Sequence, residues 1–99
     1  MSLSTHVLDL VAGAPAAGLP VRLDHRGDNG WMEVARGSTD ADGRWRYGDE
    51  PGPGVYRWLF EPSGQFFPEI AIVFVKRDEA HLHVPLLLSA FGYSTYKGS

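Results

Sequence analysis

The sequence predicts an all-β domain, either a two-sheet sandwich or a small barrel, and three observations support this prediction. Its 12 glycines and 7 prolines are spread along 99 residues, which leaves little room for long helices. Most segments between these breaks alternate apolar and polar residues, which is the period of a half-buried strand. Turn residues recur at roughly 8–12-residue spacing, as they do in sandwiches and barrels. We therefore expect roughly seven or eight short strands in one domain over residues 1–99.

The expected strands follow one another along the chain, each after a break rich in Gly, Pro, Asp or Asn. The longest unbroken apolar run covers residues 70–75, which is far short of the ~20 residues that span a bilayer. The charged residues 76–79 (KRDE) are expected to form a turn. The expected strands are residues 3–10, 21–26, 31–36, 44–47, 55–60, 69–75, 81–89 and 93–96.

Charge and cysteine content exclude several classes of function. The 9 basic and 12 acidic residues give a net charge of −3, which is not the electrostatic footprint of a nucleic-acid-binding protein. The sequence has no cysteine, so disulfides, thiolate nucleophiles and cysteine-ligated zinc are excluded. Its first residues show no basic region ahead of an apolar stretch, so we expect no secretory signal here and no membrane partner.

Strand alternation places polar nitrogen-bearing side chains on faces that also carry apolar residues. In residues 81–89 the even positions are all apolar and are expected in the core, whereas His81 and His83 share the other face. His6 lies on one face of the first strand with leucines, and Arg44 lies opposite the aromatic residues of its strand. Such mixed faces are typical of a cleft or an interface rather than of a plain solvated surface.

The pair His81 and His83 has two interpretations. Their α-carbons lie about 7 Å apart on a strand, so both imidazoles can ligate one metal ion if a third ligand such as His6 or Glu69 converges on them. The alternative is two polar residues at the end of a strand, beside a charged turn. The spacing alone does not decide between a metal site, another catalytic role and a structural role.

Other polar and aromatic residues are explained by structure alone. Residues 39–43 (TDADG) could suggest calcium, but the remaining loop ligands are lacking and a turn accounts for Asp40 and Asp42. His25 lies in a polar stretch and is expected to be exposed. The three tryptophans and the pair Phe66 and Phe67 are expected in the core or in an interface.

Motifs along the whole chain resemble the transthyretin-like 5-hydroxyisourate hydrolases. The resemblance runs from residue 3 to residue 99, and its most specific part is the terminal signature. The motifs occur in the order in which the family has them. They are residues 4–9 (STHVLD), 13–16 (GAPA), 39–44 (TDADGR), 67–69 (FPE), 81–89 (HLHVPLLLS) and 93–99 (YSTYKGS).

The resemblance implies a fold, a reaction and an assembly. The family fold is a two-sheet β-sandwich, assembled as a homotetramer (a dimer of dimers) whose active sites lie in a channel between the dimers. The family hydrolyses 5-hydroxyisourate to 2-oxo-4-hydroxy-4-carboxy-5-ureidoimidazoline in urate degradation, without a metal or an organic cofactor. The family occurs in cytosol, periplasm and peroxisome, and we expect this chain to be cytoplasmic.

The same resemblance assigns the site residues. A neutral imidazole suits the deprotonation of water near neutral pH, and a guanidinium suits the binding of substrate oxygens. Either histidine of the site can be the base, with the other one orienting the substrate or the water. By similarity, the catalytic residues are His6, Arg44 and His83, and the substrate-binding residues are Tyr96, Lys97, Gly98 and Ser99.

This sequence departs from the family pattern in three places. Lys97 stands where the family usually has Arg, and it lacks the planar fork for bidentate contacts. Ala90 replaces a usual Pro, and residues 61–65 (EPSGQ) leave no room for the family's short helix. Two other functions remain alternatives: a non-catalytic channel that binds small aromatic ligands, as transthyretin does, and a metal-binding sandwich built on His81 and His83.

Overall fold

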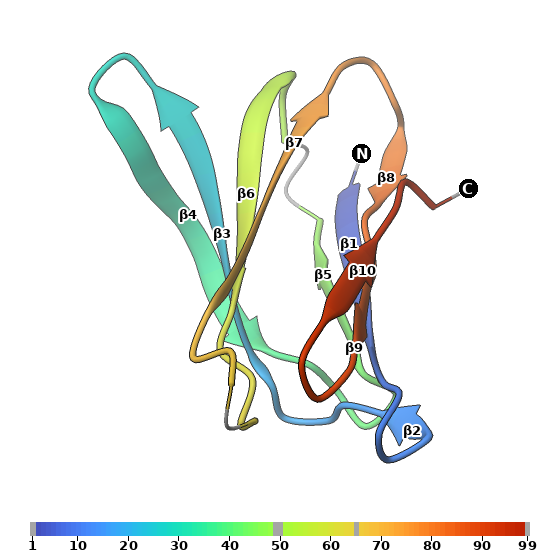
Figure 1. Ribbon diagram of the computed structural model, residues 1–99. Coiled ribbons are helices and arrows are strands. Elements are labelled where there is room, and N and C mark those ends of the chain that lie inside the picture. Colours follow the sequence, from blue (N-terminus) through green and yellow to red (C-terminus); the bar gives the residue numbers. More distant parts are fainter. Residues whose placement is uncertain (1, 49–50, 65, 99) are drawn as a thin grey trace.

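Two β-sheets packed face to face form the sandwich (Figure 1). The structure is a computed structural model that describes residues 2–48, 51–64 and 66–98. These residues hold ten strands and no helix, so none of them forms a helix that could cross a membrane. The strands are β1 (Ser2–Asp9), β2 (Ala14–Pro15), β3 (Pro20–Gly27), β4 (Gly30–Ser38), β5 (Arg44–Tyr47), β6 (Gly54–Phe60), β7 (Ile70–Lys76), β8 (His81–His83), β9 (Leu86–Leu88) and β10 (Tyr93–Thr95).

Strand β1 lies at the centre of the sheet that carries most of the predicted site. On one side it pairs antiparallel with β5 and, further along, with the short β2. On its other side it pairs parallel with β8 and then β9, and β10 closes that edge. The N-terminal strand is therefore flanked by strands from the middle and from the end of the chain. This order places three distant parts of the sequence side by side.

The second sheet has the strand order β4-β3-β6-β7, with all neighbours antiparallel. Its inner face packs against the first sheet and supplies the large side chains of the core, among them Trp58 and Phe60, which are fully buried. A β-bulge between Leu23 and Asp24 shifts the register of β3 against β4. Because two residues then oppose one, the bulge changes which side chains face inward beyond it. The expected two-sheet sandwich is confirmed.

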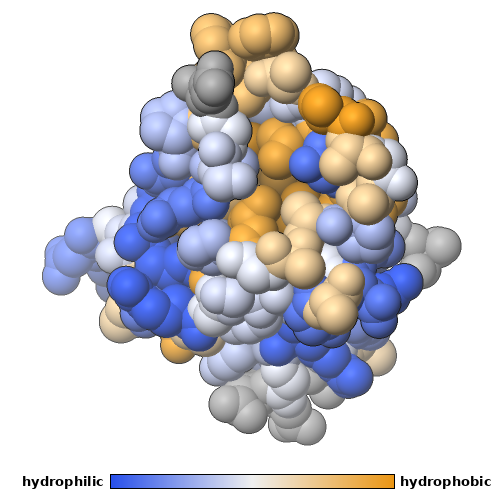
Figure 2. Space-filling view, turned by 90° about the horizontal axis from the view of Figure 1, so that it is seen from below, coloured by the Kyte–Doolittle hydropathy of each residue, from blue (hydrophilic) through white to orange (hydrophobic). Residues whose placement is uncertain are grey.

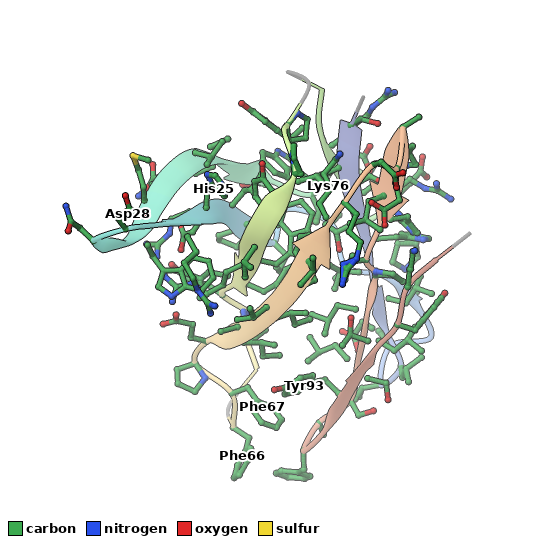
Figure 3. The ribbon with its side chains drawn as sticks, turned by 90° about the horizontal axis from the view of Figure 1, so that it is seen from above. His25, Asp28, Phe66, Phe67, Lys76 and Tyr93 are labelled. Carbon is green, nitrogen blue, oxygen red and sulfur yellow. The ribbon has the colours of Figure 1, made fainter. Side chains whose placement is uncertain are left out.

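Three expectations about single segments are wrong. Residues 81–89 form two strands, β8 and β9, separated at Val84 and Pro85, where proline offers no N–H to the ladder. Lys76 is the last residue of β7 and is buried rather than part of an exposed turn, because alternation turns it inward (Figure 3). His25 is half-buried, since its ring stacks on Tyr56 with the centroids 4.6 Å apart.

The lower end of the sandwich in Figure 1 is rich in aromatic side chains. Seen from that end, apolar surface lines a hollow between the sheets (Figure 2). Phe67 and Tyr93 approach each other edge to face, with ring centroids 5.3 Å apart (Figure 3). Phe66 contacts both Phe67 and Phe91 and is 58% exposed. These aromatics lie at the end of the sandwich where the segment 61–65 is short, and the described residues there form no helix.

Candidate active site

The alternation of β1 divides its side chains between the core and the outside. Leu3, Thr5 and Val7 are fully buried between the sheets, whereas Ser4 and His6 lie on the outer face and are half-buried. The outer face of β1, β5 and β8 carries every nitrogen-bearing side chain of the predicted catalytic set, and we call it the site face. The sandwich core thus fixes the strand on which the site is built.

Register places Arg44 beside His6. These two residues are partners in the antiparallel β1–β5 pair, so their side chains lie on the same face of the sheet. Arg44 is exposed, and it follows the turn that the sequence predicted. In that turn, Oδ1 of Asp40 accepts hydrogen bonds from the backbone N–H groups of Asp42, at 2.9 Å, and Arg44, at 3.0 Å. The hydrogen bond from Arg44 is the main cause that lowers the pKa of Asp40.

The same turn holds the imidazole of His6. Nε2 of His6 lies 2.8 Å from the backbone carbonyl oxygen of Asp42, so this nitrogen carries a proton and donates it. Gly43 lets this turn pack closely on β1: its φ is +78°, and a Cβ there would lie 2.5 Å from the carbonyl oxygen of Val7. In the neutral ring of His6, Nδ1 is then the acceptor.

His83 stands on the other side of β1, where it is the register partner of Ser4 in the parallel β1–β8 pair. Its Nδ1 lies 2.8 Å from Oγ of Ser4. The same hydroxyl lies 3.0 Å from Nε2 of His81, and Nδ1 of His81 contacts Oγ of Ser2. Among the described residues, Nε2 of His83 has no hydrogen-bond partner.

Burial and charge keep His83 neutral. Burial is the largest cause that lowers its pKa from the ordinary histidine value, and the positive charges of His81, His6 and Arg44 lower it further. A lowered pKa means that the ring stays unprotonated to more acidic pH than a free histidine. Such a ring can accept a proton near neutral pH.

A cavity of about 500 Å³ opens on the site face. It is large enough for a small heterocycle, and both cationic and hydrogen-bonding groups border it. The residues that line it are Ser4, Thr5, Ser38, Asp40, Arg44, Trp45, Arg46, His81 and His83.

The C-terminal tail reaches the site only in part. The backbone N–H of Gly98 donates to the carbonyl oxygen of His83 over 2.7 Å. Tyr96 and Lys97 instead line a separate depression beside β7, and Nζ of Lys97 pairs with Glu79 at 3.2 Å. The predicted site residue Ser99 lies outside the described residues. A single chain therefore brings Arg44 and His83 to one cavity, with His6 beside Arg44 and Gly98 against His83. It directs Tyr96 and Lys97 elsewhere.

The donor set on this face does not favour a metal. In residues 2–48, 51–64 and 66–98, no group of three or more His, Cys, Asp or Glu side chains is placed to hold an ion. Both nitrogens of His81 and Nδ1 of His83 are engaged with serine hydroxyls. The two rings are nearly parallel, with centroids 6.5 Å apart.

Sequence reasoning missed three residues of the site face: Ser2, Ser4 and Arg46. The signal for the serines was present, because Ser2, Ser4 and His6 alternate on one face of the first strand. What the sequence could not show is that this face lies against β8, whose residues are 77 or more positions away. Arg46 shares its face with Arg44, and it lines the same cavity.

Comparisons with known proteins identify similar sequences and similar structures. The family model described as HIUase/Transthyretin family matches residues 3–98. A 5-hydroxyisourate hydrolase of Salmonella dublin is 45% identical over 111 residues, covering 98% of this chain and 80% of that protein. The structure of the Klebsiella pneumoniae 5-hydroxyisourate hydrolase matches with a TM-score of 0.86 at 34% identity over the full length of both chains. Transthyretin of Sparus aurata matches with a TM-score of 0.87 at 30% identity, over 97% of this chain and 95% of that one.

Proposed function

The chain belongs to the HIUase/Transthyretin family and is an enzyme that hydrolyses 5-hydroxyisourate, and we propose that His6, Arg44 and His83 carry out this reaction on the site face. The hydrolysis is a step of urate degradation, and its product is 2-oxo-4-hydroxy-4-carboxy-5-ureidoimidazoline. The observation that carries the proposal is the register of β1 with its two neighbours. It places Arg44 opposite His6 on one side and His83 opposite Ser4 on the other.

His83 is the proposed general base. Its Nδ1 is engaged with Ser4, and its lowered pKa keeps the ring neutral near neutral pH. Nε2 therefore accepts the proton of a water molecule while the oxygen of that water forms a bond to the substrate carbonyl carbon. When the ring C–N bond breaks, Nε2 returns the proton to the leaving nitrogen, so that one water is consumed.

Arg44 is the proposed oxyanion partner. Negative charge develops on the carbonyl oxygen as water adds, and a fixed guanidinium stabilises that charge with two hydrogen-bond donors. Asp40 stabilises the turn before Arg44, because its carboxylate accepts a hydrogen bond from the backbone N–H of Arg44 over 3.0 Å. This anchor limits the motion of the arginine backbone.

His6 is the proposed orienting residue. Its Nε2–H is committed to the carbonyl oxygen of Asp42, so only Nδ1 faces other partners as an acceptor. An acceptor in this position can receive a hydrogen bond from an N–H or O–H of the substrate. The assignment of roles thus follows from which ring nitrogen of each histidine is already used.

The site of one chain is open, which supports an assembly proposal. Arg44, Arg46 and His81 are exposed, and Tyr96 and Lys97 point away from the cavity of their own chain. We expect a dimer of dimers in which a second copy covers the site face and closes the cavity. Light scattering on the purified protein tests this: a mass of four chains supports it, and an active single chain of 10.9 kDa contradicts it.

The alternative function is a transthyretin-like channel that binds small aromatic ligands without chemistry. The experiment that separates the two follows the ultraviolet absorbance of freshly generated 5-hydroxyisourate with and without the protein. The substrate also decays unaided, so buffer alone is the reference. Decay accelerated by orders of magnitude supports hydrolysis, whereas decay at the buffer rate leaves the binding function.

A further inference from the structure

Four side chains on the site face form a continuous hydrogen-bonded row. Nδ1 of His83 lies 2.8 Å from Oγ of Ser4, which lies 3.0 Å from Nε2 of His81, whose Nδ1 contacts Oγ of Ser2. Each serine is the register partner of a histidine across the β1–β8 pair. Only His83, at one end of this serine–histidine row, takes part in the proposed chemistry.

The number of protons in the row couples the two imidazoles. The Ser4 hydroxyl has one proton and can donate to only one of its two histidine neighbours. If it donates to Nε2 of His81, neutral His81 holds its own proton on Nδ1 and donates it to Ser2. Oγ of Ser4 then accepts from Nδ1–H of His83, and Nε2 of His83 is left without a proton. The opposite direction puts a proton on Nε2 of His83 and removes the base.

The surroundings favour donation of the hydrogen bond from the Ser4 hydroxyl to Nε2 of His81. The cavity that His83 lines also holds the guanidinium groups of Arg44 and Arg46. Their positive charge favours a lone pair over an N–H on the remaining nitrogen of His83.

We propose that His81 is a positioning residue of the hydrolase, which acts through Ser4 to hold His83 in the tautomer whose Nε2 is free to accept a proton. The inference rests on the proposed role of His83 as the base. It gives a function to the exposed histidine of β8, which touches no substrate in this account. It also explains why Ser4, between the two rings, bonds to both of them.

Other charged groups also surround the two rings. The titratable and charged groups that face or flank them are His6 on β1, Asp40 in the turn before β5, Arg44 and Arg46 on β5, Glu79 before β8 and Lys97 in the tail. Variants of His81 leave all of these groups in place. A change in the tautomer of His83 in such a variant therefore reports the loss of His81 itself.

The kinetic test uses two variants of one position. His81→Phe keeps a ring but removes both nitrogens, whereas His81→Gln keeps a group that can accept from the Ser4 hydroxyl. We expect kcat/KM to fall about tenfold in His81→Phe, the ratio that one hydrogen bond between neutral groups supplies, and to recover in His81→Gln.

A double-mutant cycle tests the route through Ser4. Once Ser4→Ala has removed the link, adding His81→Phe should cause no further loss, since the two residues act as one unit. Thermal unfolding of each variant shows whether the fold is kept, which we expect for the exposed position 81. Independent losses that multiply would overturn the coupling.

Nuclear magnetic resonance of protein labelled with ¹⁵N in its histidines gives a readout independent of activity. In the wild type near neutral pH, we expect His83 to be protonated on Nδ1 and unprotonated on Nε2, and this preference to be lost in His81→Phe. A wild-type His83 protonated on Nε2 overturns the inference, as does a His81→Phe variant with unchanged tautomer and rate. If the wild type matches buffer in the substrate assay, the proposed function fails, and the tautomers still decide whether the row is coupled.

Discussion

The α-carbon of Gly98 lies against the imidazole ring of His83. A Cβ built at Gly98 would stand 2.7 Å from Cδ2 of that ring, closer than side-chain carbons normally approach. The backbone N–H of the same glycine donates to the His83 carbonyl oxygen over 2.7 Å. The tail therefore packs on the proposed base through main-chain atoms, and only a glycine fits between them.

The first prediction concerns this contact. Gly98→Ala forces the tail or the ring to move, and a small displacement of a catalytic group lowers its efficiency strongly. We expect kcat/KM to fall on the order of 10- to 100-fold, with the midpoint of thermal unfolding nearly unchanged. The matched control is Gly64→Ala, since a Cβ at Gly64 has no neighbour within 4 Å. Equal kinetics for the two variants would contradict the packing role.

The second prediction concerns the geometry of Arg44. Arg44→Lys keeps the positive charge but loses the planar fork, so two oxygens of the substrate can no longer be held together. We expect a loss on the order of 10²- to 10³-fold in kcat/KM in steady-state assays. Arg36→Lys, at a position 68% exposed on β4, is the control and should retain full activity. A fully active Arg44→Lys enzyme would show that charge alone suffices.

The third prediction concerns pH. Burial, aided by the charges of His81, His6 and Arg44, lowers the pKa of His83. The protonated, inactive form is therefore disfavoured, and the acid limb of kcat/KM should lie below the ordinary histidine pKa of about 6.5. A pH–rate profile corrected for the unaided decay of the substrate checks this. An acid limb above that value would be inconsistent with His83 as the base in this environment.

The fourth prediction concerns a buried carboxylate on the other sheet. Asp24 has a side chain only 2% exposed and accepts four hydrogen bonds, two from Arg22 and two from Arg57, at 2.7 to 3.1 Å. Burial acts to raise its pKa, but the hydrogen bonds and charges of the two arginines outweigh burial and lower it. Asp24→Asn should reduce the free energy of unfolding by about 2–3 kcal/mol in urea titrations.

The pH dependence of that contribution has a definite sign. Because the folded pKa of Asp24 is lowered, its stabilisation is present above the unfolded pKa of about 3.9 and is lost as pH falls through the folded value. The destabilisation by Asp24→Asn should therefore shrink in acid. Asp78→Asn, at an exposed position, serves as the control and should change stability little at any pH. A loss that stays constant down to strongly acidic pH would refute the ion-pair explanation.

Local patterns predicted the elements and faces of this protein well. Alternation assigned Leu82, Val84 and Leu86 to the core, and all three are buried. It also put His83 and Arg44 outside the core, and the strand segments before residue 81 match the observed ones within one or two residues at most ends. These successes share one physical origin, since a strand buried on one face must place every second side chain inward.

Relations across the sheet could not be predicted from one sequence. That Ser4 lies against His81 and His83 depends on the parallel pairing of β1 with β8, which no local pattern encodes. The direction of Tyr96 is a similar case: β10 ends at Thr95, and the next residue turns toward β7 instead of the site face. The resemblance to a family supplied the set of site residues, and the structure supplied their geometry.

The central claim is that a histidine on the site face, His83, performs the hydrolysis. The most direct measurement compares His83→Gln with His25→Gln, a half-buried histidine of β3 outside the site face, in the decay assay with 5-hydroxyisourate. We predict that His83→Gln loses about 10²- to 10⁴-fold in kcat/KM and that His25→Gln keeps the wild-type rate. A His83→Gln enzyme as fast as the wild type would contradict the claim.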